Sequence, residues 1–111
     1  MSETLEFVVL GSRGDAYVVT AVRDGPAIAI ACSCRAGEMN QLCRHRLSLL
    51  DGDVSDLDSG NEADVETLHR WLPDTQAGAA VDALAAAEST FEAAKRELAA
   101  RKKALARVLR G

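Results

Sequence analysis

All three cysteines and one of the two histidines of this chain lie in one short segment, CSCRAGEMNQLCRH. Cys32 and Cys34 form a C-x-C pair, and Cys43 and His45 form a C-x-H pair after eight intervening residues. Zinc binds in proteins through four tetrahedral ligands, preferably thiolates and imidazoles. Two close pairs joined by a flexible loop supply such a set at a small cost in loop entropy. The segment therefore predicts one structural Zn²⁺ per chain, bound by all four side chains.

Other interpretations of this cluster use fewer of its residues. Three small cysteines and a histidine could share a hydrophobic core without binding a metal. A cysteine nucleophile could use His45 as its base, but no third orienting residue is evident and two thiols would have no role. A catalytic zinc keeps one coordination position for water, which four protein ligands would fill. We therefore expect no enzymatic activity.

Three short apolar segments precede the cluster and must position it: residues 5–10, 16–22 and 27–32. They are rich in β-branched residues and are separated by the turn sequences GSRGD and RDGP. This pattern predicts three antiparallel strands that form a small sheet.

The third strand is expected to bring the first two ligands together. Its two-residue alternation places Cys32 on the same face as two isoleucines and brings Cys34 to that side. Residues 35–42 are expected to form a loop that turns at Gly37, and residues 41–50 a short helix that carries the second ligand pair.

The ligand pattern and the strands before it resemble the SWIM-type zinc finger. The four ligand positions match one for one, Arg44 fits the basic residue between the last two ligands, and the likeness covers about residues 16–50. Arg46 departs from the family, in which an apolar residue commonly follows the histidine, so Leu47 and Leu50 are expected to pack this helix. The resemblance implies a zinc-stabilised module that binds protein or DNA and serves a larger partner.

The second half of the chain is expected to be helical. Residues 51–61 are acidic and rich in Gly and Ser, which is typical of a linker or of a loop that ends in a helix cap. A helix is expected over residues 62–73, and a long helix over residues 75–110, which contain no proline. The fold class is therefore α+β, with a zinc-stapled sheet and short helix in residues 1–50.

The long helix carries apolar residues at the a and d positions of a heptad repeat, broken only at Arg101. The residues of this seam are Leu84, Ala87, Phe91, Ala94, Leu98, Leu105 and Val108. A seam of this length requires another helix, so we expect a coiled-coil homodimer. A helix of another protein and packing within the chain stay open as alternatives.

Charge limits the classes of partner. The net charge is −4, which argues against strong non-specific binding to nucleic acid by the whole molecule. Arg35, Arg44 and Arg46 beside the cluster, together with a basic C-terminal end, keep a nucleic-acid-binding accessory protein as the alternative. The preferred interpretation is a dimeric adaptor that binds a larger protein.

The sequence also indicates the compartment of the protein and the roles of four single residues. The start MSETLEFVVL lacks the features of a secretory signal, and no segment approaches the roughly 20 apolar residues of a membrane span. With an odd number of cysteines, this indicates a cytoplasmic protein with metal-bound or free thiols. Trp71 is expected to be a packing anchor, His69 a surface residue, and Phe7 and Tyr17 part of the sheet core.

Overall fold

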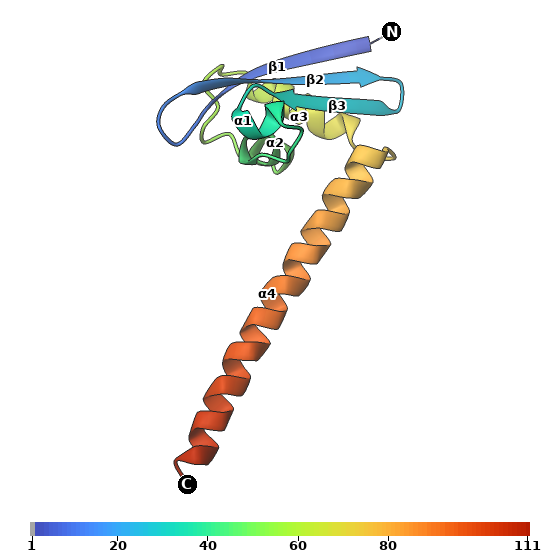
Figure 1. The fold of residues 1–111 in the computed structure, drawn as a ribbon. Coiled ribbons are helices and arrows are strands. Elements are labelled where there is room, and N and C mark those ends of the chain that lie inside the picture. The colour runs from blue at the N-terminus through green and yellow to red at the C-terminus, as the bar shows by residue number, and fades with distance from the viewer. Residues whose placement is uncertain (1) are drawn as a thin grey trace. The chain divides into compact units, whose positions relative to one another are not determined.

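A three-stranded antiparallel sheet, in the order β1-β2-β3, opens the fold in the computed structural model, which describes residues 2–111 (Figure 1). Its strands are β1 (Ser2–Leu10), β2 (Ala16–Asp24) and β3 (Ala27–Cys32). β1 and β2 are longer than their apolar segments predict, because polar residues also pair across the sheet, as Glu3 does with Arg23. Opposite charges at facing positions stabilise such a pair of strands. The predicted antiparallel sheet is confirmed.

One face of the sheet carries the hydrophobic core. Strand pairing places Phe7, Val19 and Cys32 side by side across the three strands, and all three are buried. On β3, Ile28 and Ile30 are half-buried on this face, whereas the alanines between them are exposed. The predicted alternation therefore holds, and it delivers Cys32 to the core side.

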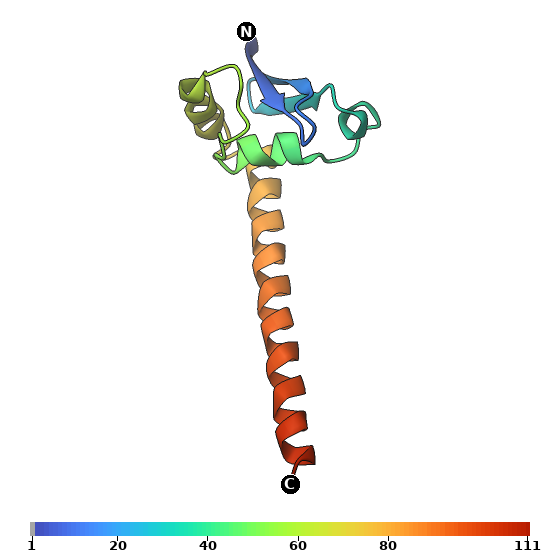
Figure 2. The same cartoon turned by 90° about the vertical axis from the view of Figure 1, so that its left-hand side faces the viewer.

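Four helices follow the sheet: α1 (Arg35–Glu38), α2 (Arg44–Leu50), α3 (Glu62–Trp71) and α4 (Gln76–Leu109). Figures 1 and 2 show α1, α2 and α3 gathered around one side of the sheet. Leu49 of α2 and Leu68 of α3 are almost inaccessible to water there. Trp71 is buried at the end of α3 and is a packing anchor, as expected.

The segment after the first ligand pair differs from the expected open loop. Its first four residues form α1, because the sulfur of Cys34 caps the turn by accepting a hydrogen bond from the backbone N–H of Gly37 at 3.3 Å. The left-handed residue is Asn40, with a φ of 58°, and not Gly37. Asparagine tolerates this conformation better than most residues.

Helix α2 begins later than expected and packs through a different leucine. Cys43 is its N-cap, so His45 and Leu49 lie one turn apart on the same face, and both are buried. Leu47 and Leu50, which were expected to pack this helix, are only half-buried. Leu49 therefore anchors α2 to the core.

Residues 51–61, which have the composition of a linker, lie along β1. The backbone N–H of Leu10 donates to the carbonyl of Asp56 at 2.9 Å, and that of Asp58 donates to the carbonyl of Val8 at 2.8 Å. Leu57 forms a bridge with Val9 and packs against the core. This segment therefore covers the free edge of β1, where unpaired backbone groups would otherwise be exposed.

His69 joins two helices and does not simply face solvent. Its Nε2 lies 2.9 Å from the carbonyl oxygen of Leu49, and its ring is only half-exposed. His69 is therefore a partly exposed residue that also contacts α2. The same carbonyl of Leu49, at the end of α2, also accepts a hydrogen bond from the backbone N–H of Gly52 at 3.1 Å.

α4 is one continuous helix of 34 residues. Thr75 caps it, since its Oγ1 accepts a hydrogen bond from the N–H of Gly78 at 3.0 Å. The chain divides into two compact units, one ending at Ala79 and the other covering residues 80–111.

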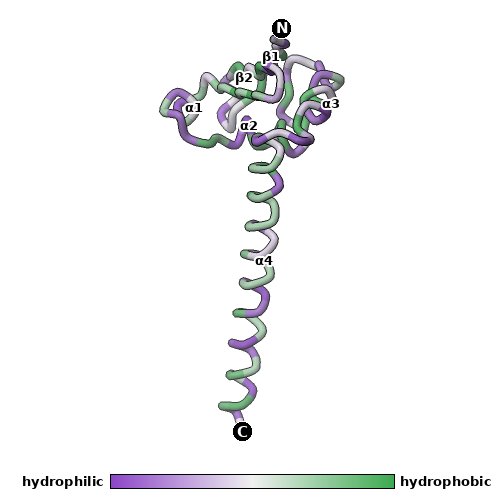
Figure 3. Tube along the Cα trace, turned by 90° about the vertical axis from the view of Figure 1, so that its right-hand side faces the viewer, coloured by the Kyte–Doolittle hydropathy of each residue, from purple (hydrophilic) through white to green (hydrophobic). Residues whose placement is uncertain are grey.

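The second unit exposes large apolar side chains. Phe91, Leu98 and Leu105 are 62%, 57% and 59% exposed. Figure 3 shows hydrophobic and hydrophilic residues alternating along α4. A long helix whose seam faces water is a typical surface for a partner. None of the helices within residues 2–111 has the length and apolar character needed to cross a membrane.

Candidate metal centre

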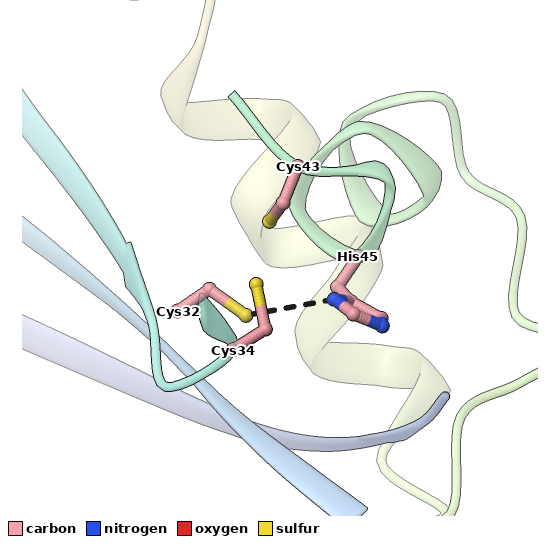
Figure 4. Close-up of side chains that lie close together, drawn as sticks. All are labelled: Cys32, Cys34, Cys43 and His45. Carbon is pink, nitrogen blue, oxygen red and sulfur yellow. Dashed lines mark hydrogen bonds between the residues drawn. The ribbon is translucent and has the colours of Figure 1, made fainter. Parts of the chain in front are cut away.

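The four predicted ligands come together in one buried cluster. One sulfur from each of Cys32, Cys34 and Cys43 and one ring nitrogen of His45 all lie within 4.8 Å of one another. Figure 4 shows the three sulfurs and the imidazole turned toward a common centre. All four residues are at least nine-tenths buried. The cluster could hold a metal ion.

The ligands come in two pairs, one where β3 ends and α1 begins and the other at the start of α2. Cys32 is the last residue of β3, and Cys34 is the N-cap of α1. Cys43 is the N-cap of α2, and His45 lies in its first turn. A metal bound here would tie the end of the sheet to the start of α2.

The distance between two of the ligand atoms suits a tetrahedral site. Nδ1 of His45 lies 3.8 Å from the sulfur of Cys32. With zinc–sulfur bonds of about 2.3 Å, neighbouring ligand atoms of a tetrahedral zinc lie about 3.5–3.8 Å apart. Three thiolates and one imidazole form a closed set of the kind found at structural zinc sites. The residues present therefore fit zinc in their chemistry, and the distance between Cys32 and His45 fits it in spacing.

Two of the thiols accept hydrogen bonds from N–H groups outside the ligand set. The backbone N–H of Gly37 donates to the sulfur of Cys34, and Nε of Arg46 donates to the sulfur of Cys43, each at 3.3 Å. Such donors stabilise the negative charge of a thiolate and fix its orientation.

Arg46 holds together three parts of the site. Besides Cys43, its guanidinium donates to the carbonyl of Ile30 on β3 at 3.2 Å and to the carbonyl of Gln41 before α2. The planar guanidinium can serve several acceptors at once, which suits this role. These contacts give a structural use to the residue that departs from the SWIM pattern. The spacing of residues in the sequence does not predict this role of Arg46.

The surroundings shift the proton affinities of the ligands in opposite directions. Burial raises the pKa of the Cys32 thiol to about 12; the backbone N–H of Cys34 acts to lower this pKa, whereas the side chains of Cys34 and Cys43 act to raise it. Burial also acts to raise the pKa of Cys43, but hydrogen bonds with Arg46, Cys34 and Cys32 together outweigh it and leave that pKa below its usual value. Cys43 is therefore the readier of the two to be a thiolate.

His45 is held in the neutral form that a metal ligand requires. Burial lowers its pKa, and the charge of Arg44 lowers it further, against a smaller opposite effect of Asp56. The ring of Tyr17 packs against it, with 4.8 Å between the ring centres and a tilt of 40°. Tyr17 thus lies beside the cluster. The sequence predicted only that it belongs to the sheet core.

An open hollow of about 580 Å³ lies next to the cluster. Its lining includes three of the four ligands, Cys34, Cys43 and His45, together with Arg13, Leu42 and Arg44. Among the arginines considered for nucleic-acid contact, Arg44 and Arg35 are exposed, whereas the guanidinium of Arg46 is used within the site.

Comparisons with protein-family models, with curated proteins and with solved structures found no match to this chain.

Proposed function

We propose that this chain is a zinc-stabilised interaction protein that dimerises through α4 and binds a larger protein partner. The observation that carries the proposal is the exposed apolar row on α4, where Phe91, Leu98 and Leu105 are each more than half exposed. Water solvates such a row poorly, and helices with a/d apolar spacing bury it by pairing.

The proposed metal is one structural Zn²⁺ per chain. The C-x-C and C-x-H spacing, its resemblance to SWIM-type fingers and the buried convergence of the four ligands support this assignment. With four protein ligands, no coordination position is left for a reacting water, so we propose binding and not catalysis. Three thiols without disulfide bonds suit a reducing compartment such as the cytoplasm.

Zinc would shape the surface that meets the larger partner. Residues 35–42 connect the two ligand pairs, so a metal at the cluster would fix both ends of this segment. Met39 and Leu42 within it are 61% and 59% exposed. Zinc binding supplies folding free energy of about 10 kcal/mol in zinc-finger peptides, enough to hold such a segment in one conformation.

A nucleic-acid-binding accessory protein is the second candidate. The hollow beside the cluster, with Arg13 and Arg44 in its lining, favours this function because guanidinium groups bind phosphates well. Fluorescence anisotropy with labelled duplex DNA and RNA tests it. Binding that weakens steeply from low to physiological salt would support this function, and no binding at low salt would rule it out.

Native mass spectrometry of the full chain, purified gently from cells, tests the main proposal. The expected species is a dimer with one zinc per chain. Cys43→Ser should lose zinc, since it removes one ligand, and Leu98→Asp should give a monomer that keeps zinc. The two variants are controls for each other. A zinc-free monomer from the unaltered chain would contradict both parts of the proposal.

A further inference from the structure

We infer that α4 pairs with α4 of a second copy in antiparallel orientation, with Leu84 of each chain beside Val108 of the other. This inference rests on the proposed dimerisation and specifies its geometry. It concerns only the second compact unit, residues 80–111, which forms the exposed part of the helix.

The sizes of the seam residues favour the antiparallel orientation. In a parallel pair each seam residue meets its own copy, so alanine would face alanine and Phe91 would face Phe91. In the antiparallel pair the a positions of one chain face the d positions of the other. Ala87 then faces Leu105, and Ala94 faces Leu98. Each small side chain meets a large one, which fills the interface evenly.

Arg101, which interrupts the apolar seam, distinguishes the orientations most clearly. A parallel pair would place it against Arg101 of the second copy, and two like charges in an interface repel each other. The antiparallel register places it beside Phe91 of the second copy. A guanidinium near an aromatic face is a favourable cation–π contact. The Phe91 ring already has one cation near it, Nζ of Lys95, 5.4 Å from its centre.

The charges along the unit are separated by sign. Residues 80–92 carry three acidic side chains and no basic one, whereas residues 95–111 carry seven basic side chains and one acidic. The antiparallel orientation places the acidic end of each helix beside the basic end of the other, including Glu88 beside Lys102. A parallel pair would place the two basic ends together. Charge complementarity therefore selects a second copy in the opposite direction.

Two charged residues meet their own copies at the centre of the antiparallel pair. Lys95 and Glu97 lie there, on opposite sides of the seam. Each already has a partner of opposite charge within its own helix: Lys95 with Glu92 at 3.7 Å, and Glu97 with Arg101 at 2.7 Å. These intrahelical pairs reduce the repulsion between the like charges.

The register also matches the extent of the second unit. With Leu84 beside Val108, Val81 lies beside Gly111, so the paired stretch covers almost all of residues 80–111 and ends where that unit begins. At 1.5 Å per residue the stretch is about 45 Å long. Each chain enters it from the opposite end.

Pulsed electron paramagnetic resonance on the zinc-loaded full chain tests the orientation. Nitroxide labels are attached at Ala83→Cys or, in a separate sample, at Arg96→Cys, both exposed positions outside the apolar seam. The antiparallel register predicts about 40 Å between the two labels at position 83. In this register position 83 of one helix lies beside position 109 of the other, about 26 residues along the axis from the second label. Labels at position 96 lie near the centre and should be much closer together. The unaltered chain shows how far the native cysteines take up label.

The outcomes separate this inference from the proposed function. A dimer with the long distance at position 83 and the short one at position 96 supports the antiparallel pair. A dimer with similar short distances at both positions means a parallel pair and overturns the inference, while the proposed dimer stands. A monomer by light scattering overturns both the inference and the proposed dimerisation, and the zinc content still tests the metal site independently.

Discussion

The N–H donors around the thiols show how residues outside the ligand set shape the cluster. Gly37 in α1 and Arg46 in α2 each donate to one sulfur at 3.3 Å. Hydrogen bonds of this kind commonly change metal affinity by 10- to 100-fold when they are lost. Both residues can therefore be tested without altering a ligand.

Gly37→Ala should weaken zinc binding by about tenfold or more. A Cβ at this position would clash with the carbonyl of Cys32, so α1 would shift and the N–H would move away from Cys34. Competition with a chromophoric chelator measures the affinity. Gly60→Ala is the control, because position 60 also disfavours alanine, with a φ of 71°, but has open space around it. Equal affinities in the two variants would contradict the role of Gly37.

Arg46→Lys should also lower zinc affinity, by about tenfold. A lysine ammonium keeps the charge but cannot reach the sulfur of Cys43 and the carbonyls of Ile30 and Gln41 together. The same chelator competition applies. Arg44→Lys is the matched control, since Arg44 is adjacent and exposed, and it should bind zinc like the unaltered chain. If Arg46→Lys bound zinc as tightly as the unaltered chain, a positive charge at position 46 would be enough for zinc binding, and the contradicted claim would be the need for the guanidinium contacts.

At the scale of elements, the sequence predicted what depends on local patterns. Strong turn residues separate the three strands, and alternation along β3 correctly placed Cys32 on the core side. The ligand pairs were found because their spacing is itself the signal. The long helix was predicted because it contains no proline and is rich in helix-forming residues.

Contacts between elements were not predictable in the same way. The 51–61 segment has the composition of a linker, and only pairing with β1 gives it a fixed course. The link from His69 to the carbonyl of Leu49 depends on how α2 and α3 pack, which no local pattern encodes. The same holds for Tyr17 against His45. Long-range packing decided these positions.

The proposed pairing of two α4 helices predicts an energetic coupling between Phe91 and Arg101. The two lie ten residues apart in one chain, about 15 Å along the axis, and meet only across an antiparallel interface. Analytical ultracentrifugation of the unaltered chain, Phe91→Ala, Arg101→Ala and the double variant gives the four dissociation constants of a double-mutant cycle. The coupling should be about 0.5–2 kcal/mol. Additive effects, within about 0.5 kcal/mol, would contradict contact between these residues.

At the scale of the whole molecule, the cluster of three cysteines and His45 and the apolar seam belong to different compact units. Trp71, the only tryptophan, is buried in the first unit and reports its folding. α4 is the longest helix and should dominate the helical signal in far-ultraviolet circular dichroism. Loss of either unit can therefore be detected separately in the same sample.

Removal of zinc with a strong chelator should unfold the first unit and leave the dimer intact. The three buried thiols and His45 would lose the ion that joins β3 to α2, so Trp71 fluorescence should shift toward that of an exposed indole. The seam does not involve these residues, so most helical signal and the dimer mass should remain. Leu98→Asp should show the reverse, a monomer with unchanged Trp71 fluorescence. If chelation instead dissociated the dimer, the two units would depend on each other and the metal would control assembly.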